Sequence, residues 1–90
     1  LTRSFPELPE PHNNLAALLA RQNRYAEALD ALQAAVRARP DYATALENLG
    51  DVYIALAMEA YQNASKAMPS QPRAASKRLA AEQLLKSSAP

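Results

Sequence analysis

The sequence has no cysteine and only one glycine, and both shortages exclude classes of protein. Without cysteine the chain cannot form disulfides, use a thiolate nucleophile or build a Cys-based zinc site, although its redox compartment stays undetermined. The single glycine, Gly50, leaves almost no means of making tight hairpin turns, and β-branched residues are few and scattered. A β-sheet protein is therefore not expected.

An excess of one charge and a long apolar run are also lacking. The chain has ten lysines and arginines and nine acidic residues, so its net charge of +1 creates no field that would attract nucleic acid or acidic lipid. The uncharged apolar run around Ile54 to Met58 is far shorter than the roughly 20 residues that span a bilayer, and no signal peptide is visible. We expect no nucleic-acid partner and no membrane insertion.

Alanine dominates what is present. Apolar residues make up 49% of the 90 residues but aromatic residues only 6%, because much of the apolar fraction is alanine, a strong helix former of small volume. This composition predicts an all-α protein. A chain of this size buries only about 60% of its unfolded surface, so its margin of stability is thin.

Prolines separate stretches with helical periodicity. Leu15, Leu18 and Leu19 follow the i, i+3, i+4 spacing of one helix face, Asn23-Arg24 interrupts, and the apolar pattern resumes until Pro40 ends it. This pattern predicts a helical hairpin. Its residues also follow a unit of about 34 residues that starts at Pro9 and ends at Tyr42. The positions that carry this pattern are Leu15, Ala16, Leu19, Tyr25, Ala28, Leu32, Ala35 and Pro40.

This arrangement resembles the tetratricopeptide repeat (TPR), and the resemblance implies an α-solenoid of helical hairpins. Two positions depart from the family pattern: His12 replaces the signature tryptophan, and Asn23 replaces the turn glycine. The second departure is mild, because asparagine tolerates left-handed backbone better than most residues. A second unit in phase begins at Ala43 and places the Leu49-Gly50 pair as the family does.

The second unit lacks the expected turn. From Ala43 to Met68 there is no proline and an unbroken apolar stripe at steps of three and four, which predicts one continuous helix. A tight turn near Leu56-Ala57 is the alternative. The far half of a continuous helix needs a partner, either the last helix, residues 73–86, returning at Pro69 to Pro72, or a second copy of the chain.

The predicted organisation has five parts: the end of a preceding repeat (1–8), a first TPR (9–42), a shortened TPR-like repeat (43–71), a C-terminal capping helix (72–86) and a tail (87–90). Because Pro6 occupies a closing-proline position, we expect the chain to be a fragment of a longer protein. In the last helix the pattern predicts one inward apolar side, formed by Ala74, Ala75, Leu79, Ala80, Leu84 and Leu85. The basic residues of that helix are then expected to face water.

The sequence offers no set of catalytic residues. His12 is the only histidine, so no multi-histidine or Cys-His site can form, and a structural role is favoured for it. Glu47 and Asp51 share a helix face, but no acid, base or metal partner accompanies them. We expect a non-enzymatic protein without cofactor or metal.

The resemblance implies that first helices of successive repeats line a concave groove that binds a protein or peptide. The positions that face this groove are Glu10, Asn13, Asn14, Ala17, Arg21, Thr44, Glu47, Asn48, Asp51 and Ile54. Asn14 and Asn48 are equivalent positions, and an amide both donates to and accepts from a peptide backbone. The predicted function is an interaction scaffold; the alternative is self-association as a dimer or swapped-helix assembly.

The composition also indicates a source for the protein but leaves its compartment open. The abundance of alanine, arginine and proline indicates a GC-rich bacterial source, and similar bacterial repeat proteins often work at the cell envelope. Cytoplasm and periplasm stay open.

Overall fold

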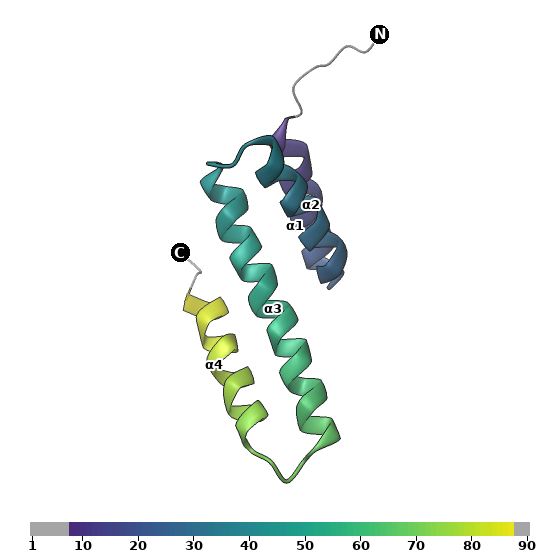
Figure 1. The fold of residues 1–90 in the computed structure, drawn as a ribbon, viewed down its shortest axis with the longest axis vertical. Helices are drawn as coiled ribbons and strands as arrows, with labels where there is room; N and C mark the ends of the chain where they lie inside the picture. Colours follow the sequence, from purple (N-terminus) through teal and green to yellow (C-terminus); the bar gives the residue numbers. More distant parts are fainter. Residues whose placement is uncertain (1–7, 88–90) are drawn as a thin grey trace. The chain divides into compact units, whose positions relative to one another are not determined.

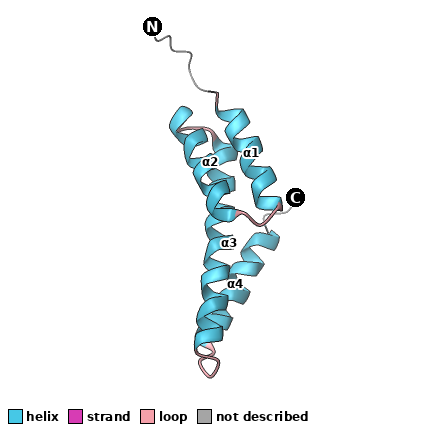
Figure 2. Cartoon of the chain, turned by 90° about the vertical axis from the view of Figure 1, so that its right-hand side faces the viewer, coloured by secondary structure: helices cyan, strands magenta, loops and turns pink. Residues whose placement is uncertain are grey.

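The computed structural model describes residues 8–87, which form four α-helices and no strand (Figures 1 and 2). The helices are α1 (Pro9–Arg21), α2 (Tyr25–Ala38), α3 (Ala43–Ala67) and α4 (Arg73–Ser87). The all-α prediction is therefore confirmed. The predicted end of a preceding repeat and the tail fall mostly outside the described residues. The chain divides into two compact units, one up to Gly50 and one from Asp51 onward.

Helix α1 starts and ends where the sequence predicts. Pro9 and Pro11 lie in its first turn. The N–H groups of a first turn have no acceptor within the helix, and proline fits there because it has no N–H group. At its end, Asn23 takes a left-handed conformation with φ of 61°. The Arg24 N–H donates to the Leu19 carbonyl at 2.9 Å and the Asn23 N–H to the Ala20 carbonyl at 3.0 Å. This is a Schellman motif, with asparagine in the usual glycine position.

The core of the first unit is made mainly of alanine. Ala28 and Ala35 of α2 are fully buried, as is Ala45 of α3, and Ala16 of α1 is 2% exposed. Such small side chains let helix backbones approach closely. Leu32 is the one large side chain below 2% exposure among the described residues. Most of the repeat-signature residues of the first hairpin thus form its core.

Helix α3 is continuous, so the predicted unbroken helix is confirmed and a turn near Leu56-Ala57 is excluded. Its 25 residues correspond to a length of about 37 Å. The signature residues of the second repeat (43–71) behave differently from those of the first repeat: Leu46 is 43% exposed and Tyr53 is 49% exposed. The physical reason is the lost turn, because the far half of α3 does not fold back over these side chains.

The second unit pairs the far half of α3 with α4, as two perpendicular views show (Figures 1 and 2). The chain turns at residues 68–72, where the Gln71 N–H donates to the Met68 carbonyl at 3.0 Å. The last helix therefore returns along α3 of the same chain. Of the two partners predicted for the far half of α3, the structure has the last helix of the same chain.

The predicted inward side of α4 is only partly correct, because Ala74 and Leu85 are half-buried but the other four residues are exposed. Leu79 is 52% exposed and Leu84 is 59% exposed, whereas Ala81 is buried and Arg78 and Glu82 are half-buried. The apolar residues of α4 are spread around the helix, so its periodicity does not define which side packs. The half-buried residues Arg78 and Glu82 form an ion pair, with Arg78 Nη1 at 3.7 Å from Glu82 Oε1.

Candidate functional site

The candidate binding residues of α1 divide into exposed and buried ones. Glu10, Asn14, Ala17 and Arg21 are exposed. Asn13 is only 7% exposed and is the one buried polar side chain of the described residues. The structure thus places Asn13 inside the unit and leaves the other four accessible to a partner.

Asn13 faces Asn48 of α3, another candidate residue. The Asn48 Nδ2 group donates a hydrogen bond to Asn13 Oδ1 at 3.0 Å, and Asn48 is half-buried. This bond connects the two helices expected to line the groove, across 35 positions of sequence. An amide has two donor hydrogens and two acceptor lone pairs, so Asn48 keeps a hydrogen and its carbonyl oxygen for another partner.

The remaining candidate residues follow one side of α3. Thr44, Glu47, Asp51 and Ile54 are separated by steps of three and four, so they lie on one face of this helix. Thr44 and Glu47 are exposed, and Asp51 and Ile54 are half-buried. The structure therefore joins Asn48 of α3 to Asn13 of α1 in the first unit. Thr44 and Glu47 lie on the face of α3 that continues to Asp51 and Ile54.

No arrangement typical of an enzyme was found among residues 8–87. His12 is half-buried at the start of α1. The described residues contain no group of three His, Cys, Asp or Glu side chains suited to a metal ion. No helix in the same range has the length and apolarity needed to cross a membrane.

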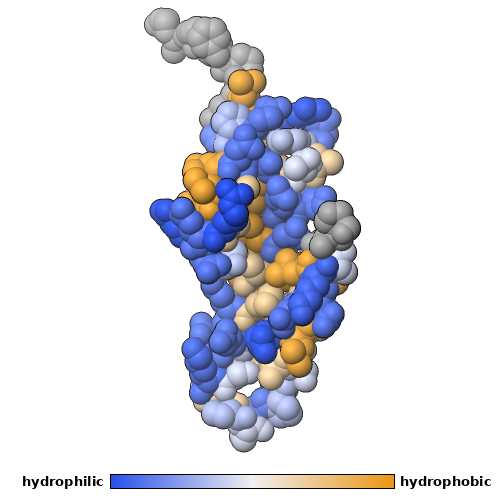
Figure 3. Space-filling model, turned by 180° about the vertical axis from the view of Figure 1, so that it is seen from behind, coloured by the Kyte–Doolittle hydropathy of each residue, from blue (hydrophilic) through white to orange (hydrophobic). Residues whose placement is uncertain are grey.

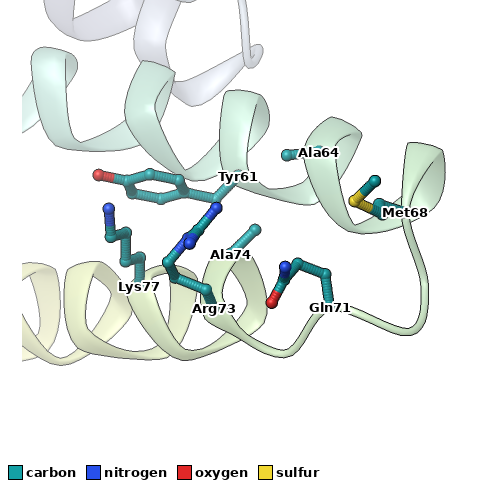
Figure 4. Close-up of a pocket in the computed structure, with 7 residues that line it drawn as sticks. All are labelled: Tyr61, Ala64, Met68, Gln71, Arg73, Ala74 and Lys77. Atoms are coloured by element: carbon teal, nitrogen blue, oxygen red, sulfur yellow. The ribbon is translucent and has the colours of Figure 1, made fainter.

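A pocket in the second unit was missed by the sequence reasoning. It lies between the end of α3 and the start of α4 and has a volume of about 260 Å³ (Figure 4). Its lining residues are Tyr61, Ala64, Met68, Gln71, Arg73, Ala74 and Lys77. One signal of it is present in the sequence: the apolar stripe of α3 ends at Met68, and the basic residues Arg73 and Lys77 follow the turn.

A helical hairpin with an alanine core is the building block of helical-repeat proteins, and a family comparison identifies the repeat. Residues 18–56 match the family model described as TPR repeat. This segment therefore carries a tetratricopeptide repeat, as its resemblance predicts. No curated protein and no solved structure matches the chain significantly. TPRs are typically non-enzymatic modules of protein–protein interaction, which is the class of function that the match supports.

Proposed function

We propose that the chain is a scaffold that binds an extended peptide or a helix of a partner protein on the groove face. We define this face as Glu10, Asn14, Ala17 and Arg21 of α1 with Thr44, Glu47 and Asn48 of α3. The observation that carries the proposal is the Asn48–Asn13 hydrogen bond at 3.0 Å. It fixes a half-buried amide on this face, and a fixed amide can bond a peptide backbone at little cost in ordering entropy.

The chemistry of the groove face supports a peptide of mixed character. Ala17 is small and exposed, so a backbone can approach α1 closely beside it. Glu47 and, further along α3, Asp51 provide negative charge, whereas Arg21 lies at the end of α1. Surface charges of this kind mainly set the rate and register of binding. A partner segment with amide or basic side chains fits this face best.

Site-specific photo-crosslinking tests the groove face. A photoreactive amino acid at Ala17 or Glu47 should yield the same covalent partner, whereas Ala26, exposed on α2, is the matched control position. The variant Asn14→Ala with Glu47→Ala should lower capture, and Asp30→Ala on α2 should leave it unchanged. Equal crosslinking from Ala26, or unchanged capture by the double variant, would exclude the groove face.

Self-association is a second candidate function, favoured by the exposed apolar residues of α3. Leu46 and Tyr53 are one heptad apart on one side of this helix, and both are more than 40% exposed. Apolar surface is visible at several places of the molecule (Figure 3). We propose that this side of α3 pairs with the same side of a second copy, as a self-complementary twofold contact.

Sedimentation velocity over a concentration series tests the self-association. Tyr53→Glu should shift the chain to the monomer, while Gln62→Glu, which adds the same charge on the opposite side of α3, should not. A wild-type chain that stays monomeric at the highest concentration would rule out this second function and leave the scaffold unaffected.

A further inference from the structure

The pocket between the end of α3 and the start of α4 has two chemically different ends. Tyr61, Ala64 and Met68 of α3 form an apolar wall, and Met68 is 58% exposed. Arg73 and Lys77 extend from α4 toward α3, with their charged groups near the Tyr61 side chain (Figure 4). A ligand that fills the pocket therefore meets apolar carbon on one side and two cations on the other.

The two cations of the pocket are electrostatically uncompensated. Neither Arg73 nor Lys77 forms an ion pair with a described residue, and no carboxylate lines the pocket. The other two basic residues of α4 differ, because Arg78 and Lys86 both approach Glu82, at 3.7 and 3.9 Å. The positive end of the α4 helix dipole adds to the same field. An anion is thus the group that this end of the pocket attracts.

The size of the pocket limits what it can hold. A volume of about 260 Å³ is slightly below the roughly 300 to 1,000 Å³ of usual small-molecule sites, which excludes a dinucleotide or a haem. The space suits one aromatic ring or one short branched chain with a single charged group. Gln71, from the turn, adds an amide that can donate a hydrogen bond to an oxygen of that group.

We propose that this pocket binds a small free carboxylic acid with one aromatic or branched apolar group. The carboxylate lies between Arg73 and Lys77, and the apolar group lies against Tyr61, Ala64 and Met68. Arginine provides two parallel N–H donors to a carboxylate, and lysine provides a point charge. For a ligand of about eleven heavy atoms in so open a pocket, the expected Kd is on the order of 1 mM.

The test is an NMR titration of the ¹⁵N-labelled chain with 3-phenylpropanoate. Amide shifts should concentrate between residues 61 and 77. The neutral analogue 3-phenylpropanol should bind about tenfold more weakly, since it lacks the charge. Arg73→Gln with Lys77→Gln should weaken binding of the acid about tenfold. The matched control, Arg37→Gln with Lys66→Gln, removes the same charge from exposed positions outside the pocket and should leave binding unchanged.

A second variant keeps the charges and removes the space. Ala64 is exposed, so Ala64→Leu should be tolerated by the fold and should abolish binding by filling the pocket. Equal binding of acid and alcohol, shifts spread over the chain, or an unaffected glutamine double variant would overturn the proposal. The same titration is repeated with a peptide that ends in phenylalanine. Binding of that peptide without binding of the free acid would also overturn the proposal.

Discussion

Asn23 carries the turn between α1 and α2 in a backbone conformation that most residues avoid. Its φ of 61° lies in the left-handed region, which costs a residue with a Cβ about 1 to 2 kcal/mol unless a short polar side chain offsets it. Its Oδ1 accepts a hydrogen bond from the Tyr25 hydroxyl at 3.0 Å. Both the backbone and the side chain therefore favour asparagine at this position.

Two substitutions of Asn23 separate these contributions. Asn23→Ala and Asn23→Gly both lose the bond to Tyr25, but only glycine adopts the left-handed region without strain. We expect the alanine variant to be less stable than the glycine variant by about 1 kcal/mol. Urea denaturation followed by circular dichroism measures the difference. Equal stability of the two variants would contradict a left-handed turn residue.

Glu27 is a residue whose titration reports the local structure at the start of α2. Arg24 donates two hydrogen bonds to its carboxylate, each at 2.7 Å, and these bonds lower the pKa of Glu27 from its usual value. A lowered folded-state pKa means that the contribution to stability is present above the unfolded-state pKa. It is lost as the pH falls through the folded-state pKa.

The prediction for Glu27 is a change of pKa in a variant. Arg24→Gln should raise the pKa of Glu27 toward its ordinary value, as measured by NMR titration of the side-chain carboxyl. The control variant Arg37→Gln, later on α2, should leave it unchanged. High salt should also raise the pKa in the wild-type chain, because both side chains are half exposed. A pKa that does not respond to Arg24→Gln would contradict the hydrogen bonds.

At the scale of elements, Gly50 shows what the continuous α3 changes in the repeat. A Cβ added at Gly50 would meet no atom within 4 Å apart from the helix itself. The small residue is thus not required for close approach of another helix, because α3 has no turn that would fold its far half back onto Gly50. Glycine in a helix interior costs about 1 kcal/mol relative to alanine.

Gly50→Ala should therefore raise the free energy of unfolding by about 1 kcal/mol. The matched control is Ala60→Gly, an exposed interior position of the same helix, which should lower stability by about the same amount. Chemical denaturation of the three proteins gives both differences. A loss of stability in Gly50→Ala would indicate that another helix packs at this position, as it would in a hairpin.

The helix ends could be predicted from the sequence, but the side that α4 buries could not. Pro9, Asn23 and Pro40 act through their own backbone, so local chemistry is sufficient to place α1 and α2. The packing side of α4 depends on what lies opposite, and apolar residues all round a helix do not define it. The same holds for Asn13, predicted at the groove, because its partner Asn48 is 35 positions away.

At the scale of the whole molecule, the core contains little volume. Buried side chains are mostly alanines, and Leu32, at 1% exposure, is the only large one in the described residues that is almost fully enclosed. Proteins of this size have roughly 5 to 13 kcal/mol of stability in total. A core built this way makes the fold depend on a few positions, whereas substitutions of exposed leucines should change little.

Leu32→Ala tests this dependence. Removing a buried leucine leaves both lost burial and a cavity, so we expect a loss of about 2 to 5 kcal/mol. Leu84→Ala is the same chemical change at a side chain that is 59% exposed, and its expected effect is under about 0.5 kcal/mol. Urea denaturation compares the two, and hydrogen exchange shows where protection is lost. We expect Leu32→Ala to accelerate exchange most in α1 and α2, which share its core. Similar losses from both substitutions would mean that Leu84 is also covered in solution, as a contact with a second copy would produce.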